Sequence, residues 1–522
     1  MNFKRKLWWA QHRTDVYKYS TFILLFLIVT ISIIYFTYSK FSSSNEMTMY
    51  ETTVEPFIKN DYFIASYIDG EWSNEIPGKN DGYAVDKIVC DNGAVGTWDN
   101  DKWAITIENA TKKIKCSVYF EQKYTDNIIA EAPELAQGMI PVTFDDSGNT
   151  VVADTSTKWY DYEAHEWANA VLVNCADSAI KSKYFDSNNK VLASAVGKTI
   201  STDEIMQMYV YIPRYKYQLF NAEDGTSVEQ AINIAFESKT TAKSTGTKNG
   251  EWLTHPAFTF GDKELAGIWV GKFETSNTSS LPKIVPNVSS LRSMNVSAQF
   301  NTSRLMTTTL ASTYGTSTND DSHMMKNMEW GAVAYLSSSI YGRYTNASTC
   351  IESGCEVWIN NNENYTTGCA GSSVSASEAP TCNAWNTATG VNASTTGNIY
   401  GIYDMSGGSW EYVMGNYNDT IRNAGFSSMP GTKYYDKYTE SNLDTDFTKY
   451  HLGDATKETL KTKSKGSNSW HGDISVFISS SYSWMRRGGG YNSVDASGLF
   501  GFDANSGISG YDNSFRVVFS AF

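Results

Sequence analysis

The sequence predicts an α+β chain with an N-terminal transmembrane helix, small β-sandwich-like modules and a C-terminal mixed domain with long loops. Three observations support this prediction: one long apolar run near the N-terminus, period-2 alternation of apolar residues between residues 55 and 122, and aromatic strands from residue 205 onward. A length of 522 residues also exceeds one ordinary hydrophobic core, so we expect several domains.

Composition narrows the class of partner. The net charge of −14 opposes phosphate backbones and no long Lys/Arg run interrupts it, so no nucleic acid is expected as a partner. Aromatic residues make up 14% of the chain, and its 33 Tyr occur beside many Ser, Asn and Gly residues. This mixture is typical of recognition surfaces, where rigid rings provide contact area and small polar side chains provide hydrogen bonds.

The apolar run from Phe22 to Tyr38 is long enough to cross a hydrocarbon core, which requires about 20 helical residues. We therefore expect a cytoplasmic tail at 1–18, a transmembrane helix at 19–39 in contact with the lipid bilayer, and a linker at 40–54. Basic residues cluster before the run, which predicts a cytoplasmic N-terminus and extracellular C-terminal domains in a single-pass cell-membrane protein. The alternative is a cleaved signal peptide, with small residues for cleavage at 42–44.

Seven cysteines fit an extracellular location, where disulfides persist. Cys90 and Cys116 lie in one short segment and are expected to pair with each other. Four more are expected to form disulfides among themselves with undetermined connectivity, and these are Cys350, Cys355, Cys369 and Cys382. Zinc binding by these four is the alternative, although their spacings lack the paired C-x2-4-C pattern.

The segment 55–122 is predicted to form a small antiparallel β module. Apolar residues alternate from Trp103 to Ile107 and from Ile114 to Phe120, and turn-forming sequences separate the strands. The following segment, 123–204, is predicted to be a second β-rich region, with no recognisable chemistry.

The residue pattern changes at residue 205, where aromatic residues become frequent in the predicted strands. Aromatic strands are expected at 206–220 and 267–276, and a helix is expected within 326–342, where apolar residues recur at helical spacing. Ser, Thr, Asn and Gly dominate much of the remaining sequence, which predicts long loops around a small framework.

Three stretches of this last region carry a family resemblance. They are GNIYGIYDMSGGSWEYVMGN at 397–416, WMRRGGGYNS at 484–493 and SFRVVF at 514–519. In this order they resemble the formylglycine-generating-enzyme (sulfatase-modifying factor) domain, a variant of the C-type lectin fold, over about 205–522. On physical grounds, Glu411 is expected to point away from Trp410 and Tyr412 along an extended segment, and Arg487 to lie against backbone carbonyls.

The resemblance does not extend to the family's catalytic residues. Members that oxidise a substrate cysteine use two cysteines near the end of the domain, whereas the last cysteine here is Cys382. The six histidines form no HxxxH or HxE pair, so no catalytic residue and no metal ligand are assigned and no enzyme activity is expected. No cofactor is predicted; calcium is one further candidate, because some relatives bind it near Glu411, but Gly408 replaces the asparagine.

The segment 490–513 resembles the variable region of diversity-generating-retroelement target proteins. In those systems mutation of adenines converts asparagine codons to Asn, Asp, Ser, Gly, Tyr, Ile, Val or Ala codons. The resemblance implies variable, ligand-binding positions at Gly490, Asn492, Ser493, Asp495, Gly501, Asp503, Asn505, Ser506, Ile508, Gly510, Tyr511, Asp512 and Asn513. An ordinary surface loop of small polar residues is the alternative interpretation.

The sequence thus predicts a membrane-anchored, adhesin-like or receptor-like protein that binds an extracellular protein or glycan. Two alternatives stay open: a metal-dependent oxidase of the formylglycine-generating type, and a structural subunit of a surface assembly.

Overall fold

The computed structural model describes residues 62–68, 71–73, 83–91, 93–99, 104–108, 114–122, 130–346, 349–351, 354–439 and 451–522. The chain divides into two compact units, Met1–Thr125 and Asp126–Phe522. The tail, transmembrane helix and linker expected at 1–54 lie outside the described residues. Among the residues that are described, no helix is both long enough and apolar enough to cross a bilayer.

The first unit consists of one mixed sheet and one hairpin. The sheet has the strand order β2-β1-β6-β3, in which β1 runs parallel to β6 and the other neighbours are antiparallel. Strands β4 and β5 form the separate hairpin. The bounds are β1 Tyr62–Ile68, β2 Glu71–Ser73, β3 Tyr83–Cys90, β4 Val95–Asp99, β5 Ala104–Glu108 and β6 Ile114–Gln122.

The alternating residues predicted for this unit form its core. Ile105, Ile107, Ile114 and Val118 are all buried by 96% or more, because every second residue of β5 and β6 faces inward. Cys116 belongs to the same core and is bonded to Cys90, directly opposite on β3, which confirms the predicted disulfide. The module is mixed rather than purely antiparallel.

Replacing both Cys90 and Cys116 with Ser is expected to destabilise the first unit by about 3 kcal/mol, because the bond closes a loop of 26 residues in a small core. Limited proteolysis should then cleave this unit at a lower denaturant concentration than in the native protein. Cys175→Ser is the control, since Cys175 forms no disulfide. Equal resistance to the protease in all three proteins would contradict this prediction.

The second unit is built around a seven-stranded sheet with the order β19-β29-β16-β10-β9-β7-β8, in which all neighbours are antiparallel. The chain's last strand therefore lies inside the sheet, between β16 and β19. The bounds are β7 Ile140–Phe144, β8 Thr150–Val152, β9 Asn169–Val173, β10 Ile205–Pro213, β16 Gly267–Gly271, β19 Asp321–Met324 and β29 Val517–Ser520.

The sequence placed a domain boundary between residues 204 and 205, but the structure joins the two sides. Strand β9, from the predicted second β-rich region, pairs with β10 over most of its length. The strands of 130–204 thus complete the sheet of the C-terminal domain, and both belong to one compact unit.

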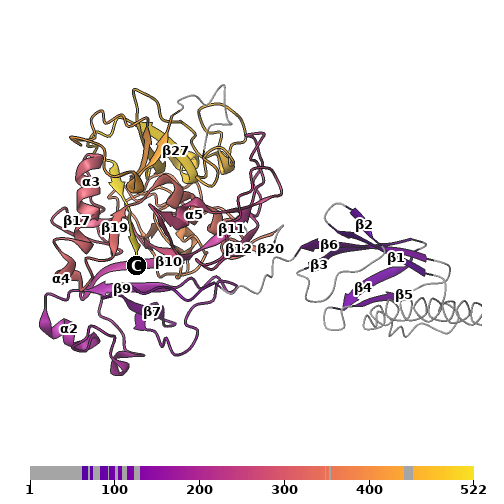
Figure 1. Cartoon of the computed structure of the whole chain (residues 1–522), viewed down its shortest axis with the longest axis horizontal. Helices are drawn as coiled ribbons and strands as arrows, with labels where there is room; N and C mark the ends of the chain where they lie inside the picture. The colour runs from indigo at the N-terminus through magenta and orange to yellow at the C-terminus, as the bar shows by residue number, and fades with distance from the viewer. Residues whose placement is uncertain are drawn as a thin grey trace, which may run out of the picture. The chain divides into compact units, whose positions relative to one another are not determined.

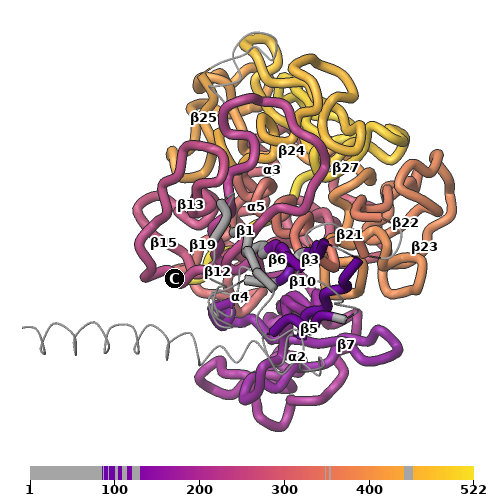
Figure 2. The backbone as a smooth tube through the Cα atoms, turned by 90° about the vertical axis from the view of Figure 1, so that its right-hand side faces the viewer, coloured from indigo at the N-terminus to yellow at the C-terminus, as the bar shows by residue number. Residues whose placement is uncertain are grey.

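A five-stranded sheet forms the opposite end of this unit (Figures 1 and 2). Both views place β27 at one end, β7 and α2 at the other, and β10 between them. The strand order of this five-stranded sheet is β25-β24-β26-β27. Strand β28 also pairs with β24, on the same edge as β25. The bounds are β24 Trp410–Tyr417, β25 Asp436–Tyr438, β26 Trp484–Gly488, β27 Gly498–Asn505 and β28 Asn513–Phe515.

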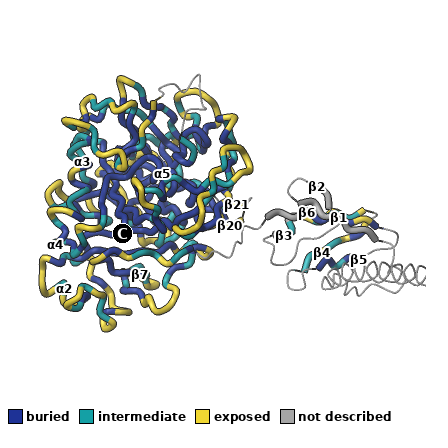
Figure 3. The backbone as a smooth tube through the Cα atoms, in the orientation of Figure 1, coloured by how far each residue is buried: buried dark blue, intermediate teal, exposed yellow. Residues whose placement is uncertain are grey.

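Helix α5, Asn327–Ser337, confirms the helix expected within 326–342. All of its residues are buried, and it lies at the centre of the unit (Figure 3). A helix surrounded by protein needs no polar face, which explains its continuous run of apolar residues. The other described α-helices are short: α2 Ser178–Tyr184, α3 Val296–Ser303 and α4 Ala311–Tyr314.

The remaining strands of the described unit form small sheets. They are a three-stranded sheet of β11 Tyr215–Gln218, β12 Ile234–Phe236 and β13 Trp252–Thr254, and the pairs β14 Thr259–Phe260 with β15 Lys263–Glu264, β17 Ser276–Thr278 with β18 Leu281–Lys283, β20 Tyr344–Asn346 with β21 Thr349–Cys350, and β22 Cys369–Ala370 with β23 Asn383–Ala384. The four later cysteines form the disulfides Cys350–Cys355 and Cys369–Cys382, each of which closes a short loop. The part of the chain that the structure describes is thus a set of β-sheets with few helices, and disulfides fix two of its loops.

Candidate functional site

Glu411 and Arg516 connect the sequence stretches that carry the family resemblance. Arg516 Nε donates to Glu411 Oε2 at 3.1 Å, and Nη2 of the same guanidinium donates to Oε1. Arg516 also donates to the carbonyl oxygens of Gly271, at 2.7 Å, and Tyr403, at 2.9 Å. Both charged side chains are at most 1% exposed. One guanidinium therefore joins β24 to the end of β16, across the two main sheets.

Two more buried acids lie close to this ion pair. Glu274 Oε1 accepts a hydrogen bond from the Ser409 N–H at 2.8 Å, and Asp404 accepts one from Asn360 Nδ2 at 2.8 Å. Burial raises the pKa of Glu411 to about 7 even though Arg516 opposes the rise, and burial also raises the pKa values of Glu274 and Asp404. The cluster has a structural role, because its oxygens are hydrogen-bonded inside the fold. Glu411, the candidate calcium ligand, has a guanidinium on both oxygens.

Arg487 and Arg486 are neighbours on β26 that point to opposite faces. Arg487 is fully buried, and its Nη2 donates to the carbonyl oxygens of Ala455 at 3.2 Å and Leu499 at 3.4 Å, which confirms the predicted contact with backbone carbonyls. The side chain of Arg486 is 13% exposed and lies in one cross-strand row with Tyr412 of β24 and Asp503 of β27. The alternation expected around Glu411 is also confirmed, because Tyr412 lies on the Arg486 side of the sheet.

The thirteen predicted ligand-binding residues, here called the candidate face, differ in exposure. Most are fully or partly exposed, and three are buried. The exposed members are Asn492, Asp495, Ile508 and Tyr511; the partly exposed ones are Ser493, Asp503, Asn505, Ser506, Gly510 and Asp512; the buried ones are Gly490, Gly501 and Asn513.

Arg486 brings three members of the candidate face together. Its guanidinium forms an ion pair with Asp503, donates to Asn513 Oδ1 at 2.9 Å, and lies 3.8 Å from Asp512 Oδ2. The same guanidinium lies 4.6 Å from the centre of the Trp410 ring. An arginine held by carboxylates over an indole is a preorganised contact point with little exposed charge.

Framework residues hold the loop that carries Ile508 and Tyr511. Arg292 donates to the Tyr511 carbonyl oxygen, and Tyr412 Oη donates to the Ile508 carbonyl oxygen at 3.1 Å. The guanidinium of Arg292 stacks 3.8 Å from the centre of the Tyr365 ring. The Tyr511 side chain remains 73% exposed on this supported backbone.

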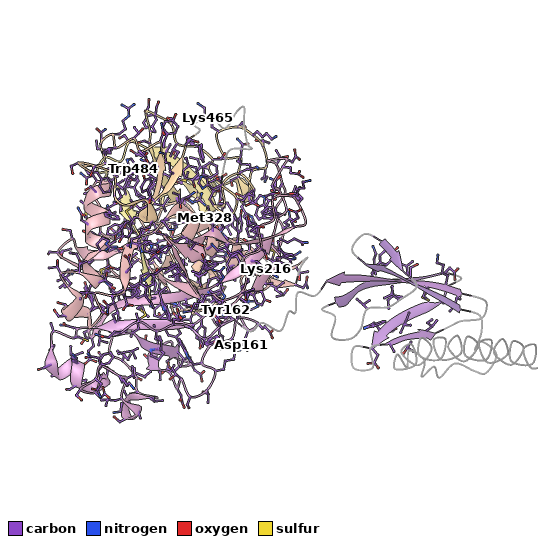
Figure 4. All side chains as sticks on the ribbon, in the orientation of Figure 1. Asp161, Tyr162, Lys216, Met328, Lys465 and Trp484 are labelled. Atoms are coloured by element: carbon purple, nitrogen blue, oxygen red, sulfur yellow. A yellow bond between two sulfur atoms is a disulfide. The ribbon has the colours of Figure 1, made fainter. Side chains whose placement is uncertain are left out.

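Other members of the candidate face lie along β27 or directly after it. Ser506 accepts a hydrogen bond from Asn423 Nδ2 at 3.2 Å, and Asn505 pairs with Trp484, labelled in Figure 4, at the start of β26. Gly501 lies within the irregular register between β26 and β27 and is buried. The structure therefore brings together the Asp503, Asp512 and Asn513 side chains, while Asn505, Ser506 and Gly501 lie apart from them.

Four residues of this site were not predicted from the sequence. Arg292, Tyr365, Arg486 and Tyr491 all contact it, and the rings of Tyr365 and Tyr491 meet edge to face at 4.8 Å. The strand alternation in WMRRGG was a usable signal for Arg486, because its neighbour Arg487 was already expected to face inward. Arg292 and Tyr365 lie in distant loops with no local pattern.

Asp495 lies beside a titrating carboxyl group. Burial raises the pKa of Glu356 to about 7, the nearby acids Glu229 and Asp495 add to the rise, and Arg343 opposes it. His471 Nδ1 lies 3.9 Å from Glu356 Oε2. The candidate face thus borders a group that changes charge near neutral pH.

Because the pKa of Glu356 is higher in the folded state than its ordinary value of 4.5, folding is favoured when this group is protonated. Its contribution to stability is therefore lost as the pH rises from about 4.5 to about 7. We expect Glu356→Gln to remain more stable than the native protein at pH 8 by on the order of 2 kcal/mol, with little difference at pH 4.5. Denaturant titrations at the two pH values, with the exposed Glu363→Gln as control, check this expectation. A difference independent of pH would contradict it.

No family model matches the chain, and no curated protein matches it significantly. Among solved structures, the chain is similar to Treponema denticola variable protein 1, at 11% identity and a TM-score of 0.23, covering 62% of this chain and 98% of that one. It is also similar to the Major Tropism Determinant I1 Variant, at 13% identity and a TM-score of 0.24, covering 75% of this chain and 97% of that one. These scores are too low to support an argument about fold or function.

Proposed function

We propose that this protein is an extracellular ligand-binding protein that contacts its partner through the candidate face. The observation that carries the proposal is that, around the five-stranded sheet, the side chains that stabilise the fold are buried while other side chains are exposed to solvent. Side chains that hold the fold, Glu411, Arg487 and Arg516, are at most 1% exposed, whereas Asn492, Asp495 and Tyr511 project from the same region into solvent. Such a surface tolerates substitution without loss of the fold.

The chemistry of the face suits recognition. Tyr511 and Tyr491 offer large rigid contacts at low entropic cost, while Asn492, Ser493 and Asp495 offer short hydrogen-bonding groups. Arg486 lies at the base with its charge neutralised by Asp503 and Asp512. The proposed partner is a protein or a glycan outside the cell.

The domain is proposed to have a C-type-lectin-like fold of the formylglycine-generating-enzyme type, and residues 19–39 are proposed to anchor it in the membrane. The segment 490–513 is proposed to be diversified by a retroelement, because its polar residues match the outcomes of adenine mutation in asparagine codons.

A binding role without catalysis is proposed for the second unit. Its four later cysteines form disulfides, and burial raises the pKa of the Cys175 thiol. A thiol in such surroundings is a poor nucleophile and metal ligand, because both roles need the thiolate.

Randomising the exposed members of the candidate face tests the proposal. We expect a displayed library varied at Asn492, Asp495, Ile508 and Tyr511 to retain the native melting temperature within a few degrees and to yield binders to an unrelated protein such as lysozyme. A matched library at exposed residues outside the face, Ser467, Tyr482, Thr247 and Val228, is expected to yield none. Loss of folding throughout the first library, or equal success of both, would contradict the proposal.

Diversification has a separate test in the nucleotide sequence. We expect a reverse transcriptase gene near the coding sequence, together with a near-repeat of its last segment that differs mainly at adenines. A locus without either would leave a fixed binding face.

A further inference from the structure

A cavity lies outside the candidate face. It has a volume of about 760 Å³ and contains no residue of 490–513; we call it the Trp385 cleft. Its walls come from the loop before β8, the segment leading into β10, the β17–β18 hairpin with the loop after it, and the residues after β23. The apolar lining residues include Ile205, Met208, Val285 and Trp385. The polar ones include Thr202, Asn277, Asn287 and Asn386.

The lining of the cleft mixes apolar and polar residues, and its rim is polar and nearly uncharged. Ile205, Met208 and Trp385 are buried, whereas Asn277 and Asn386 are exposed at the rim. Lys283 is the single cation and Asp203 the single anion among the described lining residues, so their charges cancel. The volume of the cleft lies within the range of about 300–1,000 Å³ that is typical of small-ligand sites.

The polar groups of the rim match hydroxyl groups. Asn side chains offer both donors and acceptors, and Ser and Thr hydroxyls do the same, so the rim can satisfy a ligand that carries many hydroxyls and no charge. A strongly anionic ligand would meet one lysine and one carboxylate, and a purely apolar ligand would leave the rim amides without partners.

The walls of the cleft are fixed rather than mobile loops. Trp385 and Asn386 follow β23, which the Cys369–Cys382 disulfide ties to β22, and the Trp385 ring packs edge-on against Phe144 and Phe273. On the facing wall, Asn287 N–H donates to the Thr367 carbonyl oxygen at 2.9 Å. A rigid site loses little conformational entropy when it binds a ligand.

Two rim residues also have uncommon backbone conformations. Asn277 and Asn287 adopt left-handed φ angles of 70° and 63°. Asn adopts this region readily in turns. The Asn277 amide also donates to the Leu281 carbonyl oxygen at 2.6 Å, which fixes its place in the β17–β18 hairpin.

From this geometry we infer that the Trp385 cleft binds a short neutral saccharide, independently of the candidate face. The hydroxyls of such a ligand fit the Asn and Thr side chains of the rim, and the lining carries no net charge that would favour an ionic ligand. The protein would then have two recognition sites, one with a fixed saccharide specificity and one on 490–513.

Saturation-transfer NMR with the full-length protein in detergent micelles tests this inference. The probes are the neutral trisaccharides maltotriose, mannotriose and chitotriose, with sialyllactose as the anionic probe. We expect transfer to at least one neutral trisaccharide. Thr202→Trp and Asn386→Trp each fill the cleft and are expected to weaken that binding at least about tenfold, with melting temperatures showing that both variants fold.

Tyr511→Ala separates this site from the proposed function, because it alters the candidate face and leaves the cleft intact. Neutral-sugar binding is expected to survive Tyr511→Ala. Absence of transfer to all three neutral probes, binding of sialyllactose alone, or binding unaffected by both tryptophan substitutions would overturn the inference. Loss of binding in Tyr511→Ala but not in the cleft variants would place the sugar on the candidate face instead.

Discussion

Replacing Arg516 with Met is expected to lower the free energy of unfolding of the second unit by about 3–5 kcal/mol. The substitution leaves the Glu411 carboxylate buried without its partner and removes the donors to the Gly271 and Tyr403 carbonyl oxygens. The double substitution Arg516→Met with Glu411→Met is expected to recover part of this loss, because it removes the buried charge as well.

Denaturant unfolding followed by tryptophan fluorescence measures both variants. Arg422→Met is the matched control, since Arg422 is exposed and its Nε donates to a single carbonyl oxygen, that of Ser480. Its expected effect is below about 0.5 kcal/mol. Equal stability of the Arg516 and Arg422 variants would mean that the Glu411–Arg516 pair does not join the two sheets as described.

Replacing Arg486 with Ala is expected to weaken binding at the candidate face by about 2 kcal/mol or more, which is about 30-fold. Without the guanidinium, Asp503 and Asp512 lose their counter-charge and Asn513 loses a donor, so the face becomes more negative and less ordered. Biolayer interferometry with a binder selected on the face measures the effect.

Arg422→Ala serves as the control for this substitution as well, and its affinity is expected to equal that of the native protein. Far-ultraviolet circular dichroism shows whether the Arg486 variant keeps its fold. Native affinity in a folded Arg486→Ala protein would remove Arg486 from the site.

Local periodicity predicted the strands and the central helix because each depends on neighbouring residues. The alternation from Ile105 to Val118 gave the core of the first unit, and the spacing of Met328, Ala332 and Leu336 gave α5. The Cys90–Cys116 disulfide was also predictable, because both cysteines lie in one short segment that contains no other cysteine.

Long-range pairing was not predictable from such patterns. Strand β9 reads as part of a separate region until its register with β10 is known, and the chain end of β29 gives no sign that it enters the middle of a sheet. The same limit applies to the site. Arg292 and Tyr365 reach the candidate face from loops more than a hundred residues away in sequence, so no local signal marks them.

Exposure also could not be read from residue type. Asn513 and Asp495 are both small polar residues in one segment, yet Asn513 is 2% exposed because it bonds Arg486, and Asp495 is exposed. Predicted variable positions therefore divide into those that contact solvent and those that support the sheet.

We propose above that the candidate face binds an extracellular ligand. The most direct measurement compares native protein, Tyr511→Ala and Tyr482→Ala for binding to an array of glycans and bacterial surface proteins. Both tyrosines are well exposed, at 73% and 58%, but Tyr482 lies outside the candidate face. We expect a ligand that binds the native and Tyr482→Ala proteins equally and the Tyr511→Ala protein at least about tenfold more weakly. A ligand whose binding is lost in Tyr482→Ala and retained in Tyr511→Ala would contradict it.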